Sequence, residues 1–161
     1  MTGIPNSTPT GETPARRPRI VVGVDGSEHS KLALRWAARI AAAEGAQLDA
    51  VTAWHYPAYT GYAVLPAEYA PQQEFAKLLT ETVDEVFGDQ RPEGLRLRTV
   101  EGAAAAVLLA ASRDALMTVV GSRGHGGFAG LLLGSVSSAV AEHAGCPVLV
   151  VHGGSEPPEQ P

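Results

Sequence analysis

Residues 119–137 read VVGSRGHGGFAGLLLGSVS, and this stretch decides the fold. The segment from Leu116 to Val120 predicts a buried strand, because it is short, apolar and closed by a glycine. Five glycines follow at positions 121, 124, 126, 127 and 130, too many for the interior of a helix or a strand. From Val136 onward, apolar residues recur at three- and four-residue spacing, which indicates a helix. The stretch therefore predicts a strand, a glycine-rich loop and a helix, in that order.

The chemistry of this loop favours an anion. Glycines let the backbone turn sharply and approach a ligand closely, so its N–H groups can surround phosphate oxygens. Gly134 and Ser135 stand at the start of the following helix, where free N–H groups and the positive end of the helix dipole attract negative charge. Ser135 or Ser137 can cap that helix. We therefore expect a phosphate-binding loop.

Two common nucleotide motifs do not fit. The P-loop requires a lysine next to its last glycine, and no lysine stands after Lys77. The dinucleotide fingerprint places its glycines after the first strand, whereas this loop follows the fourth predicted strand. What the chain contains is Gly121, two residues, Gly124, nine residues, then Gly134 and Ser135.

The rest of the chain alternates strand and helix. Strands are predicted at residues 20–24, 47–54, 95–100, 116–120 and 147–151, and helices at about 28–44, 72–87, 103–113 and 134–144. Within this pattern, Ser27 is expected to cap the first helix, while Gly45 and Gly145 are expected to end the first and last helices. Such alternation predicts an α/β, Rossmann-like fold: an open, five-stranded, mainly parallel sheet with helices on both faces. We expect the strand order 3-2-1-4-5, which makes the first and fourth strands neighbours. Asp25, after the first strand, and the glycine loop, after the fourth, would then face one crevice.

Length and composition set the domain plan and exclude several classes of protein. The 161 residues predict one domain at 19–152, with flexible tails at 1–18 and 153–161. The long connection from His55 to Pro71 is expected to act as a binding lid or an interface. The net charge of −5, without a lysine or arginine block, predicts no nucleic-acid partner. No apolar run is long enough to span a membrane, no secretory signal is present, and the single Cys146 suits a reducing compartment, so we expect a cytoplasmic protein. Histidine spacing predicts no protein-held metal, and no catalytic residue is assigned.

Three segments together resemble the universal stress protein family. They are Ile20 to Ser27 with the following Arg35-Trp36-Ala37, the stretch from Gly121 to Ser137, and Cys146 to Val151. The spacing G-x2-G-x9-G-S is similar to the signature of the ATP-binding branch. The resemblance implies a small α/β protein that binds ATP together with Mg²⁺ or Mn²⁺, held through the phosphates, and that commonly forms a homodimer.

The resemblance also implies a set of binding residues. Those after the first strand would contact ribose, those ending the second strand would flank adenine, and the loop would hold ribose and phosphates. The set is Gly23, Val24, Asp25, Val51, Thr52, Ala53, Gly121, Ser122, Arg123, Gly124, His125, Gly126, Gly127, Gly134, Ser135, Val136 and Ser137. For Arg123, the alternative to holding phosphate is a position on the surface or in a dimer contact.

The functional prediction is a stress-response sensor or regulatory module. It would be switched by nucleotide occupancy and would act on an unknown downstream protein. One alternative is a slow ATPase or autophosphorylating enzyme, although the sequence offers no lysine for the phosphates and no evident base. Another alternative is a protein-interaction dimer with a vestigial site. The homodimer is expected to form through the strand at about residues 147–152, because that strand is apolar, lacks lysine and lies at a sheet edge in the predicted order.

Overall fold

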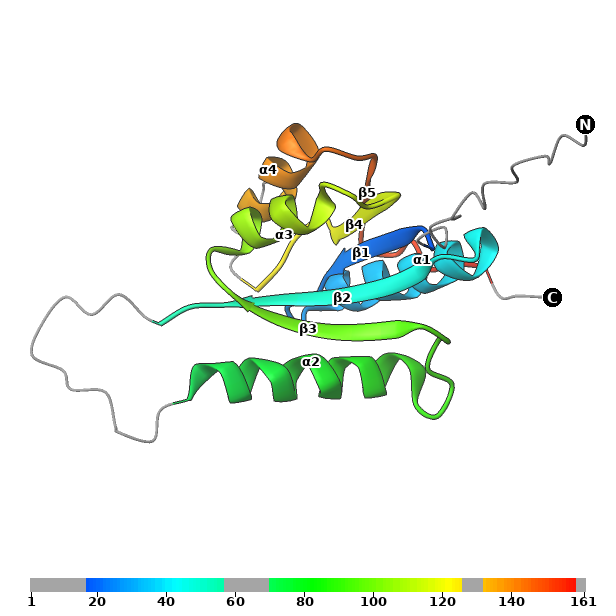
Figure 1. Cartoon of the computed structure of the whole chain (residues 1–161), viewed down its shortest axis with the longest axis horizontal. Coiled ribbons are helices and arrows are strands. Elements are labelled where there is room, and N and C mark those ends of the chain that lie inside the picture. The colour runs from blue at the N-terminus through cyan, green and yellow to red at the C-terminus, as the bar shows by residue number, and fades with distance from the viewer. Residues whose placement is uncertain (1–16, 57–69, 126–131, 159–161) are drawn as a thin grey trace, which may run out of the picture.

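The computed structural model describes residues 17–56, 70–125 and 132–158, which form a three-layer α/β structure (Figure 1). In chain order the elements are β1 (Arg19–Gly23), α1 (Glu28–Glu44), β2 (Gln47–Trp54), α2 (Pro71–Phe87), β3 (Leu95–Glu101), α3 (Ala104–Ser112), β4 (Met117–Gly121), α4 (Ser135–His143) and β5 (Val148–Val151). The alternation predicted from hydrophobic spacing is therefore confirmed, with boundaries that differ by at most one residue.

The sheet has five strands in the order β3-β2-β1-β4-β5, and every neighbouring pair is parallel. This confirms the predicted order. The central pair β1 and β4 is aligned so that Val22 lies opposite Val119. Because these two strands run side by side in the same direction, the segments that follow them leave the sheet at the same edge.

Two apolar cores hold the layers together. Helices α1 and α2 cover one face of the sheet, where Ile20, Leu34 and Leu48 are fully buried. Helices α3 and α4 cover the other face, where Val21 and Val140 are fully buried. Strands β1 and β4 carry apolar residues on both faces because both of their faces are covered, as in other parallel sheets.

The ends of α1 follow the sequence prediction. The Ser27 side chain accepts a hydrogen bond from the Ser30 N–H, and Gly45 ends the helix in the left-handed region with φ of 59°. The capping residues predicted for α4 are wrong. Its N-cap is Gly134 and no side chain caps it, because the Ser137 hydroxyl donates instead to the carbonyl of Gly121. Its C-cap is Ala144 in an extended conformation, so Gly145 does not end the helix.

Helix α1 contacts three residues of the predicted C-terminal tail, Ser155, Glu156 and Pro158. Arg35 forms an ion pair with Glu156, with 2.8 Å between Nη1 and Oε1, and the indole N–H of Trp36 donates to the carbonyl of Ser155. The Arg39 guanidinium donates to the carbonyl of Pro158 over 2.7 Å. Most of the connection predicted as a lid, 57–69, and residues 1–16 of the predicted N-terminal tail lie outside the described residues. No helix in the described part of the chain is long and apolar enough to cross a membrane.

Candidate functional site

A cavity of about 750 Å³ opens where β1 and β4 end. Asp25 enters it directly after β1, and the glycine-rich loop enters it after β4. Fourteen of the predicted binding residues line it: Gly23, Val24, Asp25, Val51, Thr52, Ala53, Gly121, Arg123, Gly124, His125, Gly134, Ser135, Val136 and Ser137. The strand order explains this convergence, since a crevice forms where connections from adjacent strands diverge to opposite faces of the sheet.

Three of the predicted residues stand apart from this set. Ser122 does not line the cavity: it is buried, and its backbone is hydrogen-bonded to Val151 of β5 and to Gly134. Gly126 and Gly127 lie outside the described residues.

Backbone hydrogen bonds hold both ends of the loop on the sheet. The Ser122 N–H donates to the Val151 carbonyl over 2.7 Å, and the Ser122 carbonyl accepts from the Gly134 N–H over 2.8 Å. The Ser137 hydroxyl donates to the Gly121 carbonyl over 2.6 Å. The first contact ties the end of β4 to β5, and the other two place the start of α4 beside the end of β4.

Close packing requires glycine at two loop positions. A Cβ atom at Gly121 would lie 2.7 Å from the backbone of His29 in α1. A Cβ atom at Gly124 would overlap the Asp25 carboxylate. Both glycines are therefore needed for the loop to pass this close to α1 and to the end of β1.

Asp25 connects the loop to the end of β1. Its Oδ2 atom accepts a hydrogen bond from the His125 N–H over 3.2 Å, and its Oδ1 atom accepts from the N–H and hydroxyl of Ser27 over 3.0 Å and 2.6 Å. Burial alone would raise the pKa of this carboxyl. The hydrogen bonds, chiefly those with Ser27, outweigh burial and hold the pKa below its ordinary value. Asp25 is thus a carboxylate at neutral pH.

The start of α4 supplies donors for an anion. Ser135, Val136 and Ser137 form its first turn and line the cavity. N–H groups in a first turn have no intrahelical acceptor, and no side chain caps this helix. This end of the cavity can therefore bind an anionic group through backbone donors and the helix dipole.

Part of the cavity lining is apolar and was only partly foreseen. Val51 and Ala53 lie there with Leu108 and Ala104 from α3 and with Phe75 from α2. Sequence reasoning missed the lining residues Ser30, His55, Phe75, Ala104, Leu108, Val120 and Leu133. The four-residue spacing of Ala104 and Leu108 places them on one helix face, and this could have signalled a shared surface.

Few charges line this cavity. Among its described lining residues, Arg123 is the one lysine or arginine and Asp25 the one carboxylate. Loop residues 126–131, GGFAGL, contribute no charged side chain. Across the described residues, no group of three His, Cys, Asp or Glu side chains could hold a metal ion.

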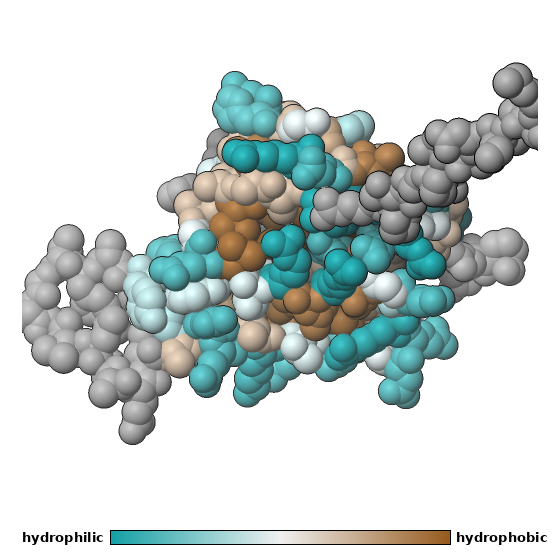
Figure 2. All heavy atoms as spheres, in the orientation of Figure 1, coloured by the Kyte–Doolittle hydropathy of each residue, from teal (hydrophilic) through white to brown (hydrophobic). Residues whose placement is uncertain are grey.

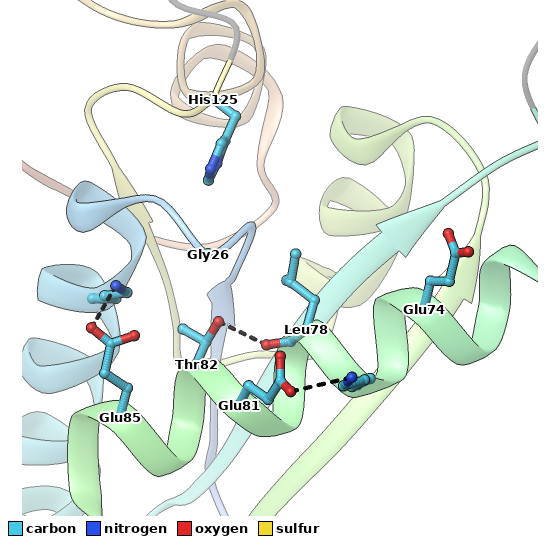
Figure 3. A pocket seen from close by; sticks show the side chains of 9 residues that line it. Gly26, Glu74, Leu78, Glu81, Thr82, Glu85 and His125 are labelled. Atoms are coloured by element: carbon cyan, nitrogen blue, oxygen red, sulfur yellow. Dashed lines mark hydrogen bonds and ion pairs between the residues drawn. The ribbon is translucent and has the colours of Figure 1, made fainter.

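A smaller cavity of about 350 Å³ lies on the other side of His125, between that residue and α2 (Figure 3). Its lysines are already paired with carboxylates. Lys31 Nζ lies 2.7 Å from both Glu28 Oε1 and Glu85 Oε1, and Lys77 Nζ lies 3.7 Å from Glu81 Oε1. Phosphate binding is therefore better supported in the larger cavity.

Comparison with known proteins identifies relatives of this chain. A model of the universal stress protein family matches residues 17–152. A universal stress protein of Mycobacterium tuberculosis is 35% identical over 139 residues, which cover 83% of this chain and 47% of that relative. This chain thus spans about half the length of the curated relatives that it matches.

Solved structures agree with the fold. A universal stress protein in complex with cAMP is 33% identical, with a TM-score of 0.62, and the match covers 84% of this chain and 97% of that one. A universal stress protein of Lactobacillus plantarum is 24% identical, with a TM-score of 0.63, and covers 85% of this chain and 99% of its own. The second likeness bears on the fold alone.

Proposed function

This chain belongs to the universal stress protein family, and we propose that it binds an adenine nucleotide, ATP in the first place, in the cavity between β1 and β4. The observation that carries this proposal is the meeting of Asp25, the glycine-rich loop and the first turn of α4 around one cavity. The nucleotide would act as a switch rather than as a substrate for rapid turnover.

The lining offers both backbone donors and an apolar surface, which suit the two parts of a nucleotide. The first turn of α4 and the loop glycines offer backbone donors for phosphate oxygens. Val51, Ala53 and Leu108 offer an apolar surface for a base. Asp25, ionised and held in place by Ser27, can accept hydrogen bonds from ribose hydroxyls. The relative solved with cAMP supports an adenine nucleotide as the class of ligand.

The low charge of the cavity suggests how a triphosphate would be held. Among the described lining residues, Arg123 is the one lysine or arginine. A single positive charge cannot balance the several negative charges of a triphosphate. We propose that Mg²⁺ or Mn²⁺ enters with ATP and is held mainly by phosphate oxygens and water. Within the described residues, no group of three His, Cys, Asp or Glu side chains could hold the metal ion in place of the phosphates.

A regulatory role fits the lining better than rapid phosphoryl transfer. Efficient transfer normally uses a cation on the phosphates and a residue that orients the attacking group. Asp25, the one carboxylate in the described lining, is already engaged with Ser27 and His125. We therefore propose a cytoplasmic stress-response sensor that changes its conformation or its partner when nucleotide binds.

The direct test is calorimetric titration of the protein with ATP and with cAMP, each with and without Mg²⁺. Gly124→Val should abolish binding, because even a Cβ atom at this position overlaps the Asp25 carboxylate. Asp25→Ala should weaken binding about tenfold or more, as expected for loss of a hydrogen bond to a charged group. Glu81→Ala in the smaller cavity is the matched control and should bind like the wild type.

Three outcomes of this titration would be informative. Wild-type protein that binds neither nucleotide would contradict the proposal and favour a protein-interaction module. Binding that survives Gly124→Val would place the ligand elsewhere on the chain. Steady phosphate release that disappears together with binding would favour the enzyme alternative.

A further inference from the structure

Strand β3 has one face that no described helix covers along most of its length. Helix α2 packs against β2 and β3 on one side of the sheet, whereas α3 packs against β1, β2 and β4 on the other. Val100, near the end of β3, reaches the apolar cluster beneath α3. Arg96 and Arg98 precede it on the same face, since alternate residues of a strand point to the same side, and both are exposed. Figure 2 shows hydrophilic side chains across the middle of this face, where β2 and β3 run.

These arginines belong to a cluster whose members do not line the nucleotide cavity. Arg19 of β1 and Arg98 of β3 each place Nη1 3.5 Å from Oδ2 of the buried Asp49 in β2. Arg96 lies opposite Asp49 in the β2–β3 register. We call Arg19, Asp49, Arg96 and Arg98 the arginine face. Three arginines against one aspartate leave it with a net charge of +2, on a chain whose net charge is −5.

The cluster is incompletely satisfied internally. Within the described residues, Oδ1 of Asp49 is buried and has no hydrogen-bond partner, and both of its ion pairs are long. Asp49 therefore neutralises Arg19 and Arg98 only in part. Arg96 has no ion pair among the described residues. Positive charge on this face remains available to an acidic group.

Strand β3 is also an edge of the sheet. It pairs with β2 on one side, and no described strand pairs with it on the other. It extends over seven residues, compared with four for β5 at the opposite edge. The outer edge of such a strand presents N–H and carbonyl groups that can pair with an extended peptide. Arg96 and Arg98 would flank any strand added there.

We propose that the β3 edge binds an extended acidic segment of a partner protein, which adds to the sheet as a further strand. Backbone hydrogen bonds would supply general affinity, and carboxylates on alternate residues of the segment would meet Arg96 and Arg98. A second copy of this chain is a poor occupant, because pairing β3 with β3 would bring like charges together. This surface does not line the nucleotide cavity, so the inference does not depend on nucleotide binding.

The test uses the full chain and a capped, fluorescein-labelled octapeptide of alternating valine and glutamate, followed by fluorescence anisotropy. We expect binding at about 50 mM salt that weakens strongly at about 500 mM, where exposed charges are screened. Arg96→Glu should weaken binding about tenfold, because it replaces attraction with like-charge repulsion. Arg98 is left unchanged, because its loss would also remove a partner of the buried Asp49.

Two controls separate this surface from general electrostatics. Lys77→Glu makes the same charge change on the exposed side of α2 and should leave binding within about twofold. A peptide with glutamine in place of glutamate should bind at least about tenfold more weakly than the acidic peptide. Amide chemical shifts should change in residues 95–101 when the acidic peptide is added.

Several results would overturn the proposal. They are absence of binding by the wild type up to about 1 mM peptide, equal loss in Arg96→Glu and Lys77→Glu, or shifts confined to elements other than β3. A single-stranded oligonucleotide that binds in place of the peptide and loses affinity in Arg96→Glu would assign the surface to nucleic acid instead.

Discussion

The backbone N–H of His125 donates a hydrogen bond to Oδ2 of Asp25 over 3.2 Å, across one hundred residues of sequence. This contact joins the glycine-rich loop to the end of β1. It also engages one oxygen of a carboxylate that lines the cavity. A ligand that bonds to Oδ2 must either share this oxygen with the loop or displace the His125 N–H, and this would couple binding to the position of the loop.

The first prediction concerns the charge of Asp25. The folded state lowers the pKa of this carboxyl below its ordinary value of 3.8, chiefly because hydrogen bonds with Ser27 outweigh the effect of burial. A group with a lowered folded-state pKa stabilises the fold above its unfolded pKa, and the effect is lost as the pH falls through the folded value. Asp25→Asn should therefore lower the free energy of unfolding more at pH 7 than at pH 3.

Urea unfolding of both proteins at the two pH values measures this difference. Asparagine keeps the shape of the side chain and one carbonyl oxygen, so packing is matched. An equal difference at both pH values would mean that the ionised form of Asp25 contributes nothing to stability.

The second prediction concerns Gly121. Gly121→Ala would place a methyl group 2.7 Å from the backbone of His29, and backbone cannot move aside cheaply. We expect a loss of about 1–3 kcal/mol in the free energy of unfolding. Gly134→Ala is the matched control, because its nearest neighbour would lie 3.6 Å away, in ordinary contact. Thermal unfolding of the two variants should show a clearly lower Tm for Gly121→Ala, and similar Tm values would contradict the close packing of β4 against α1.

The third prediction concerns Ser137. Its hydroxyl donates to the Gly121 carbonyl over 2.6 Å in a buried setting and so holds α4 beside β4. Ser137→Ala should cost about 1–3 kcal/mol of stability, because the carbonyl loses a buried donor. Ser135→Ala, two residues earlier and exposed, should change stability little. Denaturant midpoints for the two variants decide the matter, and equal midpoints would show that Ser137 does not hold the helix.

The fourth prediction concerns the proposed homodimer. Strand β5 is an edge strand of four apolar residues, so its outer edge can pair with the same strand of a second copy. We expect a dimer in sedimentation velocity at micromolar concentration, and a monomer after Val150→Lys, because pairing would bring two ammonium groups together. Far-UV circular dichroism controls for folding. A monomeric wild type would remove the proposal.

Sequence reasoning was most successful where local chemistry decides the structure. Helix α1 is capped by Ser27 at its start and by Gly45 at its end, as predicted. Both caps are local, because a serine cap and a left-handed glycine act within one helical turn. The parallel sheet also followed from the alternation of strands and helices. Its expected order, which alternation alone does not fix, is confirmed. The predicted cap of α4 failed for a tertiary reason, since Gly121, distant in sequence, accepts the Ser137 hydroxyl.

The alternation of elements and the parallel sheet could be predicted from the amino-acid sequence, because hydrophobic period and glycine spacing are local properties of the chain. Only the tertiary structure decided that Phe75 and Leu108 complete the cavity and that Asp25 holds the His125 N–H. It also decided that Arg19 and Arg98 meet over Asp49. These contacts join segments far apart in sequence, and they depend on how helices pack across a twisted sheet, which no local pattern encodes.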